Sequence, residues 1–208
     1  MPTRYPAINL FDRVADEADF DALYALEGMS NERARDELGL VERVPREERV
    51  YGNGSGPIMA AFTHVNVLGS RFSAGRYGVF YAARERATAV AETRHHHGRF
   101  LVATAQPPMH LPMRLYSVAI DASLHDLRPS GAVPAAVYDG GDYAAAQALG
   151  RRLHGHGSAG VAYRSVRHPG GQCAGLFRPR GASGCHHAAY LLYAWDGQRF
   201  SDIYEKLV

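Results

Sequence analysis

The segment AAYLLYAWDGQRFSDIY, residues 188–204, constrains the fold of this chain more than any other. Apolar and aromatic residues lead up to Asp196-Gly197 and resume after it. An Asp-Gly pair between two such runs predicts a β-hairpin. Further strand-like runs occupy residues 77–83, 113–121, 159–166 and 172–179. Because these strands outnumber the helices expected in the core, the predicted fold is mixed, and we place it in the α+β class.

The first 48 residues predict a helical N-terminal arm ahead of a main domain at residues 49–208. Residues 16–28 have helical composition, with Asp16 as the N-cap and Gly28 as the stop, and residues 30–39 predict a second helix. The charged helices of such an arm suit either contact with a partner or a passive cover over the sheet.

Two helices are predicted in the main domain, at residues 85–98 and 142–155. Gly98 is expected to end the first helix, and Asp142 to cap the second. The Gly-rich residues 51–57 predict a loop, and residues 58–65 fit either a short helix or a buried strand.

The overall charge excludes some classes of partner. The formal net charge is +2, which argues against broad binding of nucleic acids or membranes through net charge, although arginine outnumbers lysine and a local basic patch stays possible. No apolar run approaches the roughly 18 residues of a membrane span, and the N-terminus lacks the apolar core of a signal peptide. The two cysteines, Cys173 and Cys185, are expected to be thiols of a soluble cytoplasmic protein.

Common nucleotide and metal motifs are missing. The sequence GNGSG follows no predicted strand, so it does not fit a dinucleotide-binding turn, and there is no phosphate-binding loop. The eleven histidines include three clusters, at 95–97, 154–156 and 186–187, without the spacing of a zinc site. Solvent-facing histidines at helix ends are therefore predicted. His96 is the exception, because it follows Glu92 by one helical turn and can share its face.

One strand–helix unit, RFSAGRYGVFYAARERATAVAE, carries three groups that could do chemistry. Arg71 precedes the predicted strand, Tyr81 lies on it, and Glu92 lies on the helix among small apolar neighbours. A carboxylate in such surroundings must be paired, have its pKa raised, or be used. Ser165 adds a hydroxyl at the end of a later strand, where it could bind a ligand or cap a turn.

These residues resemble the RES domain, a family named for its Arg, Glu and Ser. GSRFSAGRYGVFYAARERATAVAE, followed downstream by YRSVRHPGG, has the order and spacing of the family, so Arg71, Glu92 and Ser165 match its three named residues and Tyr81 its tyrosine. The resemblance covers roughly residues 49–195. One departure is Phe72-Ser73, where many members have Trp-Asn, which puts a direct role for Ser73 in doubt.

The resemblance implies a fold like that of ADP-ribosylating toxins and a reaction on NAD⁺, which is consumed as a substrate, so no resident cofactor is expected. It also implies an Xre-type antitoxin that occupies the active-site cleft. Arg71 would bind phosphate, Tyr81 would face nicotinamide or its ribose, Glu92 would stabilise the cationic sugar, and Ser165 would hold the amide or ribose. Further candidates for lining the cleft or orienting Glu92 are Tyr51, His64 and His96.

Several functions stay open at this stage. Within the leading hypothesis, NAD⁺ degradation by hydrolysis or phosphorolysis competes with ADP-ribosyl transfer to a cellular protein, and no residue separates them. A non-catalytic protein that keeps the fold to bind a regulator is a different class, which the intact set of four residues disfavours. A zinc hydrolase built on the histidines is a third.

Overall fold

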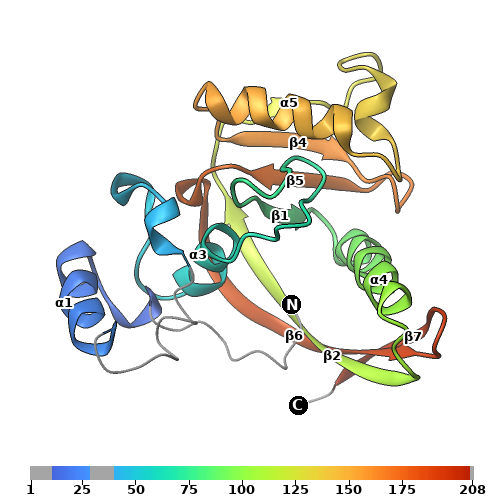
Figure 1. The fold of residues 1–208 in the computed structure, drawn as a ribbon, viewed down its shortest axis with the longest axis horizontal. Helices are drawn as coiled ribbons and strands as arrows, with labels where there is room; N and C mark the ends of the chain where they lie inside the picture. Colours follow the sequence, from blue (N-terminus) through green and yellow to red (C-terminus); the bar gives the residue numbers. More distant parts are fainter. Residues whose placement is uncertain (1–10, 29–39, 207–208) are drawn as a thin grey trace.

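The computed structural model describes residues 11–28 and 40–206 and has two separate sheets (Figure 1). The first has four strands in the order β1-β5-β4-β3: β1 (Phe80–Ala83), β5 (Gln172–Leu176), β4 (Gly160–Arg164) and β3 (His125–Asp126). Its first three strands are antiparallel, and β3 is parallel to β4. The second sheet is antiparallel, in the order β2 (Met109–Ile120), β6 (Ala182–Trp195) and β7 (Phe200–Lys206). The α+β class is confirmed.

The predicted hairpin forms β6 and β7. Residues 196–199 make the turn, with Gly197 at a φ of +101°, in the left-handed region that favours glycine. The Asp196 carboxylate accepts the backbone N–H groups of Gln198 and Arg199 at 2.8 and 2.7 Å, which fixes the turn.

The described residues contain four α-helices: α1 (Glu17–Gly28), α3 (Ser55–Thr63), α4 (Arg86–Ala103) and α5 (Ala144–Gly155). Short 3-10 turns lie at Phe11–Arg13, Val41–Arg43, Arg46–Glu48, Ala135–Tyr138 and Pro179–Gly181. The helix predicted at residues 30–39 lies outside the described residues, and the domain division after residue 48 stays a prediction. At the start of α1, Asp16 accepts the Asp19 N–H at 3.0 Å, so the predicted N-cap is confirmed.

The sequence prediction was wrong at the end of α4. Helix α4 does not stop at Gly98 but continues to Ala103, where Ala105 adopts a left-handed φ of +48° and the N–H of Gln106 reaches the Leu101 carbonyl. This is the bonding pattern of a helix end, and Pro107 and Pro108 follow it. The histidines at 95–97 therefore lie inside the helix and not at its end.

Helix α3 includes the last residues of the predicted loop at 51–57 and resolves the ambiguity at 58–65 in favour of helix. Its N-terminus is capped from far away in the chain. Asp12 accepts the Gly56 N–H at 2.6 Å, and the Ser55 hydroxyl lies 3.2 Å from the same carboxylate oxygen. The capping group lies 44 positions earlier, so local composition could not reveal it.

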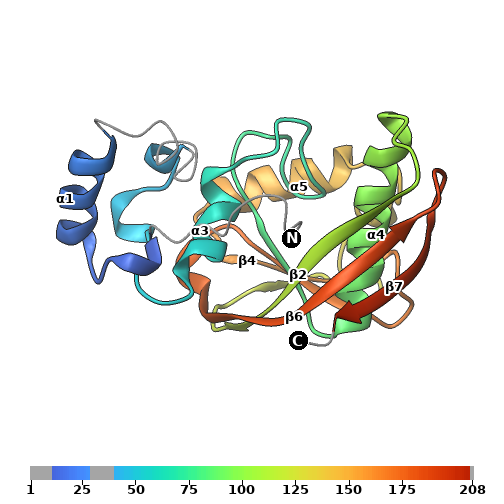
Figure 2. The ribbon, with the colours of Figure 1, turned by 90° about the horizontal axis from the view of Figure 1, so that it is seen from below.

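Within residues 11–28 and 40–206, three apolar clusters hold the helices and sheets together. Helix α5 packs on the four-stranded sheet through Ala146, which contacts a cluster that includes Val161 and Phe177. Helix α4 packs on the three-stranded sheet through Leu101, beside Trp195. The arm and α3 form a third cluster around Phe11, Phe20, Val41, Val44 and Met59. Figures 1 and 2 both show α1 at the end of the molecule away from α4.

Helix α4 contacts both halves of the fold. It is joined to the three-stranded sheet by Arg86, which pairs with Glu205 at 2.8 Å, and by Arg94, which donates to the Phe200 carbonyl at 2.9 Å. The Thr93 hydroxyl lies 2.8 Å from that of Tyr193 on β6. Its other face meets the loop that follows β4.

Candidate active site

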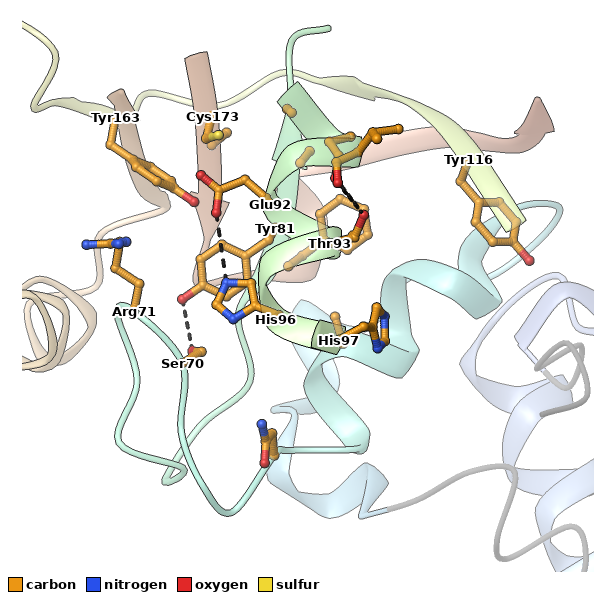
Figure 3. Close-up of a pocket in the computed structure, with 18 of the residues that line it drawn as sticks. Ser70, Arg71, Tyr81, Glu92, Thr93, His96, His97, Tyr116, Tyr163 and Cys173 are labelled. Atoms are coloured by element: carbon orange, nitrogen blue, oxygen red, sulfur yellow. Dashed lines mark hydrogen bonds and ion pairs between the residues drawn. The ribbon is translucent and has the colours of Figure 1, made fainter. Parts of the chain in front are cut away.

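A cleft of about 2450 Å³ lies between the two sheets, with α4 along one side (Figure 3). One wall comes from β1, β4 and β5 and includes Tyr81, Tyr163 and Cys173. The other comes from β2 and β6 and includes Met113, Tyr116, Leu191 and Tyr193. Ligand pockets more often have volumes of roughly 300–1,000 Å³. The cleft therefore has room for a dinucleotide and more.

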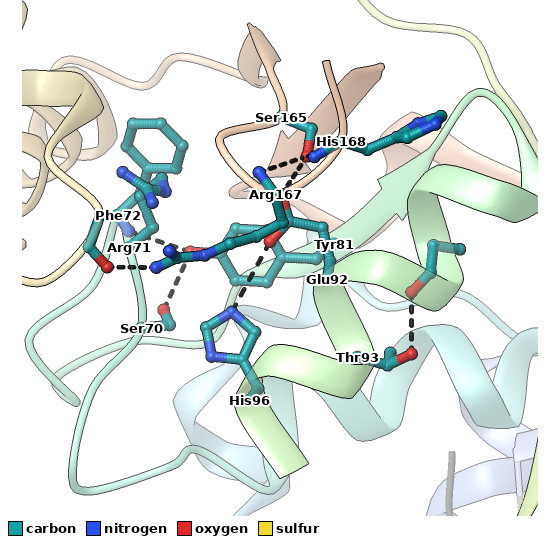
Figure 4. A network of polar contacts seen from close by, with 12 residues as sticks. Ser70, Arg71, Phe72, Tyr81, Glu92, Thr93, His96, Ser165, Arg167 and His168 are labelled. Atoms are coloured by element: carbon teal, nitrogen blue, oxygen red, sulfur yellow. Dashed lines mark hydrogen bonds and ion pairs between the residues drawn. The ribbon is translucent and has the colours of Figure 1, made fainter. Parts of the chain in front are cut away.

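Glu92 projects from α4 into the cleft and is held by Ser165 (Figure 4). The Ser165 hydroxyl donates to Glu92 Oε1 at 2.6 Å and accepts the backbone N–H groups of Arg167 and His168, each at 3.0 Å. The Glu92 side chain is 17% exposed. Because Oε1 is occupied by Ser165, Oε2 is the oxygen left for a ligand.

His96 lies beside the same carboxylate, one turn further along α4. Its Nε2 is 3.9 Å from Glu92 Oε2, too far for a hydrogen bond. Partial burial lowers the pKa of His96, and Glu92 only partly opposes this effect. His96 is therefore a neutral neighbour of Glu92 at pH 7.

Tyr81 is fixed through its hydroxyl. That oxygen accepts the Phe72 N–H at 2.9 Å and lies 2.9 Å from the Ser70 hydroxyl, while the residue keeps 37% of its surface exposed. Burial of the hydroxyl end raises the pKa of Tyr81 to about 12, so the phenol stays protonated at neutral pH. Tyr81 can present an aromatic face and a hydrogen bond to a ligand but cannot act as a base.

Arg71 lies at the inner edge of the cleft and is only 6% exposed. Its Nη1 donates to the carbonyls of Val137 and Asp139 at 3.2 and 2.9 Å, and its guanidinium lies 4.6 Å from the Tyr143 ring centroid. These contacts orient a permanently charged, planar group, which suits recognition of phosphate.

The lining of the cleft is basic although the whole chain is nearly neutral. Arginines outnumber carboxylates among the lining residues: Arg71, Arg84, Arg86, Arg99, Arg114 and Arg128, against Glu85, Glu92 and Asp142. Some are paired; Arg128, for example, contacts Asp126 at 2.7 Å. The excess of positive charge favours an anionic ligand.

Nucleophilic chemistry by cysteine does not fit this site. Cys173 lines the cleft, but burial and the nearby Glu92 carboxylate raise its pKa to about 11, so the thiol is not ionised at neutral pH. Cys173 and Cys185 are both free and buried, as predicted for thiols.

Comparison with known proteins gives the family. The RES domain matches residues 41–196, about three quarters of the chain and every residue of the set Arg71, Tyr81, Glu92 and Ser165. The chain belongs to the RES domain family. It is also similar to Uncharacterized protein y4oC of Sinorhizobium fredii (strain NBRC 101917 / NGR234), at 25% identity over 219 residues that cover 98% of this chain and 84% of the relative.

Membership of the RES domain family supports a toxin-type, NAD-related role and an association with enzymatic activity on NAD. Members of the family typically pair with antitoxins. Among the described residues, no helix has both the length and the apolar character needed to cross a bilayer. Nor do three His, Cys, Asp or Glu side chains gather in a metal-binding arrangement within residues 11–28 and 40–206.

The structure places some of the candidate residues of the RES domain in the cleft lining and others outside it. Arg71, Tyr81, Glu92, His64 and His96 all line the cleft. Ser165 does not line it and reaches it only through Glu92.

Tyr51, the remaining candidate, and Ser73, whose direct role was in doubt, both lie outside the cleft lining. Tyr51 is not among the lining residues and packs in the arm cluster, its ring centroid 5.6 Å from that of Phe20. Ser73 is buried and donates to the Tyr77 carbonyl at 2.6 Å, which is a structural contact.

Sequence reasoning missed two side chains that shape the RES domain site. Ser70 lies beside the Tyr81 hydroxyl, and Tyr163 lines the cleft from β4. Ser70 adjoins Arg71 in the sequence, and Tyr163 lies on β4, the strand that leads into Ser165. Proximity to these two candidates is the signal that could have drawn attention to both residues.

Proposed function

We propose that this RES domain breaks the bond between nicotinamide and ribose in NAD⁺ and depletes NAD⁺ by hydrolysis or phosphorolysis. In this proposal it is the toxin of a toxin–antitoxin pair that acts on the cytoplasmic NAD⁺ pool. The proposal rests on one observation above all. Glu92 is held at 2.6 Å by Ser165 in a basic cleft that Arg71 and Tyr81 also line.

Cleavage of the nicotinamide–ribose bond is favoured by a fixed negative charge beside the ribose. When the bond between ribose C1′ and the nicotinamide nitrogen breaks, its electron pair leaves with nicotinamide and C1′ becomes cationic. The Glu92 carboxylate would stabilise that cation and bind the 2′-hydroxyl through Oε2, as carboxylates do in glycoside cleavage. In hydrolysis, a water oxygen then forms the new bond to C1′ and releases a proton to solvent; in phosphorolysis, an anionic phosphate oxygen forms the bond and has no proton to release.

The neighbouring groups suit the rest of NAD⁺. The exposed part of the Tyr81 ring offers a rigid aromatic face to nicotinamide or its ribose. Arg71 and the other lining arginines offer positive charge to the pyrophosphate. NAD⁺ is consumed in this reaction, so the proposal needs no resident cofactor and no metal.

ADP-ribosyl transfer to a cellular protein is the second candidate, and one observation favours it. The cleft is larger than a small-molecule pocket, and Val67 and Leu68 beside it are 80% and 86% exposed. An apolar rim of this kind could contact a protein acceptor. The same cleft would take the Xre-type antitoxin that the proposal includes as a partner.

The test is nicotinamide release from NAD⁺ by the purified protein, with and without phosphate, beside Glu92→Gln. Turnover should fall at least on the order of 100-fold in the variant, because the charge that stabilises the cation is gone. NAD⁺ labelled in its adenylate half distinguishes the acceptors, since label ends on small molecules in degradation and on protein in transfer.

A matched control is Glu47→Gln, which removes an exposed carboxylate of the arm that does not line the cleft. It should keep wild-type turnover. Wild-type turnover by Glu92→Gln would instead rule out the role given to Glu92.

A further inference from the structure

A second contact joins α4 to the loop that carries Ser165. Thr88 lies one helical turn before Glu92, so both side chains share a face of α4. The Thr88 hydroxyl is fully buried and lies 2.8 Å from Nδ1 of His168. Thr88 and His168 are not among the residues that line the cleft, so any influence on a ligand must act through other groups.

His168 is linked directly to the Ser165–Glu92 contact. Its backbone N–H and that of Arg167 both donate to the Ser165 oxygen. A serine hydroxyl has two lone pairs and one proton. With both lone pairs engaged by these N–H groups, the proton is directed outward to Glu92 Oε1. The position of residues 167 and 168 thereby sets the direction of the bond that holds the carboxylate.

The loop from Ser165 to Gly171 is closed and closely packed against Thr88. The Gly171 N–H donates to the His168 carbonyl, and the Ser165 N–H donates to the Gly171 carbonyl, each at 2.9 Å. A Cβ at Gly171 would lie 2.6 Å from the Thr88 hydroxyl and 3.0 Å from His168 Nδ1. No side chain fits between the loop and the helix at this point, which keeps the Thr88–His168 contact short.

We propose that Thr88 and His168 are positioning residues for Glu92. Their hydrogen bond fixes the 165–171 loop on α4, so that Ser165 meets Glu92 at the correct distance and the carboxylate is held in one orientation in the cleft. This inference rests on the proposed function for its effect on catalysis. Its structural part, the ordering of the loop, stands on the contacts alone.

The test compares Thr88→Val, which removes the hydroxyl and keeps the side-chain shape, with Thr88→Ser, which keeps the hydroxyl. Thr88→Val should lower kcat for nicotinamide release about tenfold, with KM for NAD⁺ changed less than about threefold, because the transition state needs the oriented carboxylate. Thr88→Ser should stay within about threefold of wild type. His168→Ala should behave like Thr88→Val, while His168→Asn, whose amide can replace Nδ1, should recover part of the loss.

Amide hydrogen exchange over residues 165–171 supplies a readout that does not depend on activity. The Arg167 and His168 amides should exchange faster in Thr88→Val and keep their protection in Thr88→Ser. Val44→Ala, a truncation in the arm cluster outside the cleft, controls for general loss of stability and should leave kcat unchanged.

The outcomes separate this inference from the proposed function. Unchanged exchange of the loop in Thr88→Val overturns the inference, as does a loosened loop with an unchanged kcat. If wild-type protein releases no nicotinamide from NAD⁺, the proposed function fails, and so does the effect on catalysis inferred for the Thr88–His168 contact. Exchange then still decides whether the contact orders the loop.

Discussion

Ser165 donates its only hydroxyl proton to Glu92 across 2.6 Å, although 73 positions separate the two residues in the chain. The serine lies outside the cleft lining and the glutamate lies in it. In this geometry the serine acts on a ligand through the carboxylate, whereas the family resemblance implied direct contact with the amide or ribose.

Replacement of Ser165 distinguishes these two roles. In Ser165→Ala the carboxylate loses the group that orients it, so kcat for nicotinamide release should fall about tenfold or more while KM for NAD⁺ changes little. Steady-state kinetics on the purified variant provide the measurement. A raised KM at unchanged kcat would mean that Ser165 contacts NAD⁺ directly.

Replacement of Arg71 should affect both stability and binding. Arg71→Ala removes the donor for the Val137 and Asp139 carbonyls, so we expect the free energy of unfolding to fall by about 1–3 kcal/mol. It also removes a charged group from the cleft, so KM for NAD⁺ should rise. Denaturant unfolding and kinetics measure the two effects separately. Arg76→Ala, an exposed arginine five positions on, should change neither quantity, and an unchanged KM in Arg71→Ala would leave Arg71 a structural role alone.

Acid should destabilise the fold through His95. Burial, followed by the nearby Arg167, lowers the pKa of His95 to about 4, and its Nε2 is buried without a hydrogen-bond partner. The unfolded chain takes up this proton as the pH falls through about 6.5, and the folded chain does so only near pH 4. The unfolded state therefore binds more protons in this window, and stability must decrease as the pH falls through it.

The variant His95→Gln should show a shallower fall of Tm between pH 6.5 and 4.5 than wild type. Fluorescence of Trp195, the one tryptophan of the chain, reports unfolding because its side chain is buried in the core beneath α4. His110→Gln removes an exposed histidine on β2 and should keep the wild-type slope. Equal slopes in all three proteins would contradict the assignment to His95.

Two glycines inside helices should respond oppositely to alanine. A Cβ at Gly98 in α4 would lie 3.9 Å from the rings of Phe200 and Trp195, an ordinary contact, so Gly98→Ala should stabilise the fold by about 0.5–1 kcal/mol. A Cβ at Gly150 in α5 would overlap the Phe72 carbonyl, so Gly150→Ala should destabilise it. Thermal unfolding measures both changes, and a lower Tm for Gly98→Ala would contradict this reading of α4.

The local features of the fold were accessible from sequence. The Asp196-Gly197 hairpin and the Asp16 cap each depend on neighbouring residues, and both are confirmed. The end of α4 was missed, because Gly98 resembles a stop while the deciding group is the left-handed Ala105 ahead of two prolines. The division into two sheets was also not predicted, since β2 pairs with β6 across a long separation in the chain.

The residues of the candidate site also fall into those that the sequence indicated and those that it did not. Small apolar neighbours drew attention to Glu92, and the family pattern assigned roles to Arg71, Tyr81 and Ser165. Thr88 gave no signal, because a threonine in an alanine-rich helix carries no mark of its partner 80 positions away. Tyr51 lies outside the cleft lining because its ring packs against Phe11 and Phe20 of the arm, and local sequence does not reveal these contacts.

Helix α4 is fastened to the three-stranded sheet by Arg86, Thr93 and Arg94, and to the loop after β4 by Thr88 and Glu92. Helix α4 therefore bridges the two walls of the cleft. A small rotation or shift of α4 would change the width of the cleft without any substitution among the lining residues, and Glu92 would move with the helix. In the proposed reaction, substitutions at Thr88 or Arg94, which do not line the cleft, would then alter the size of the acceptor that the cleft admits.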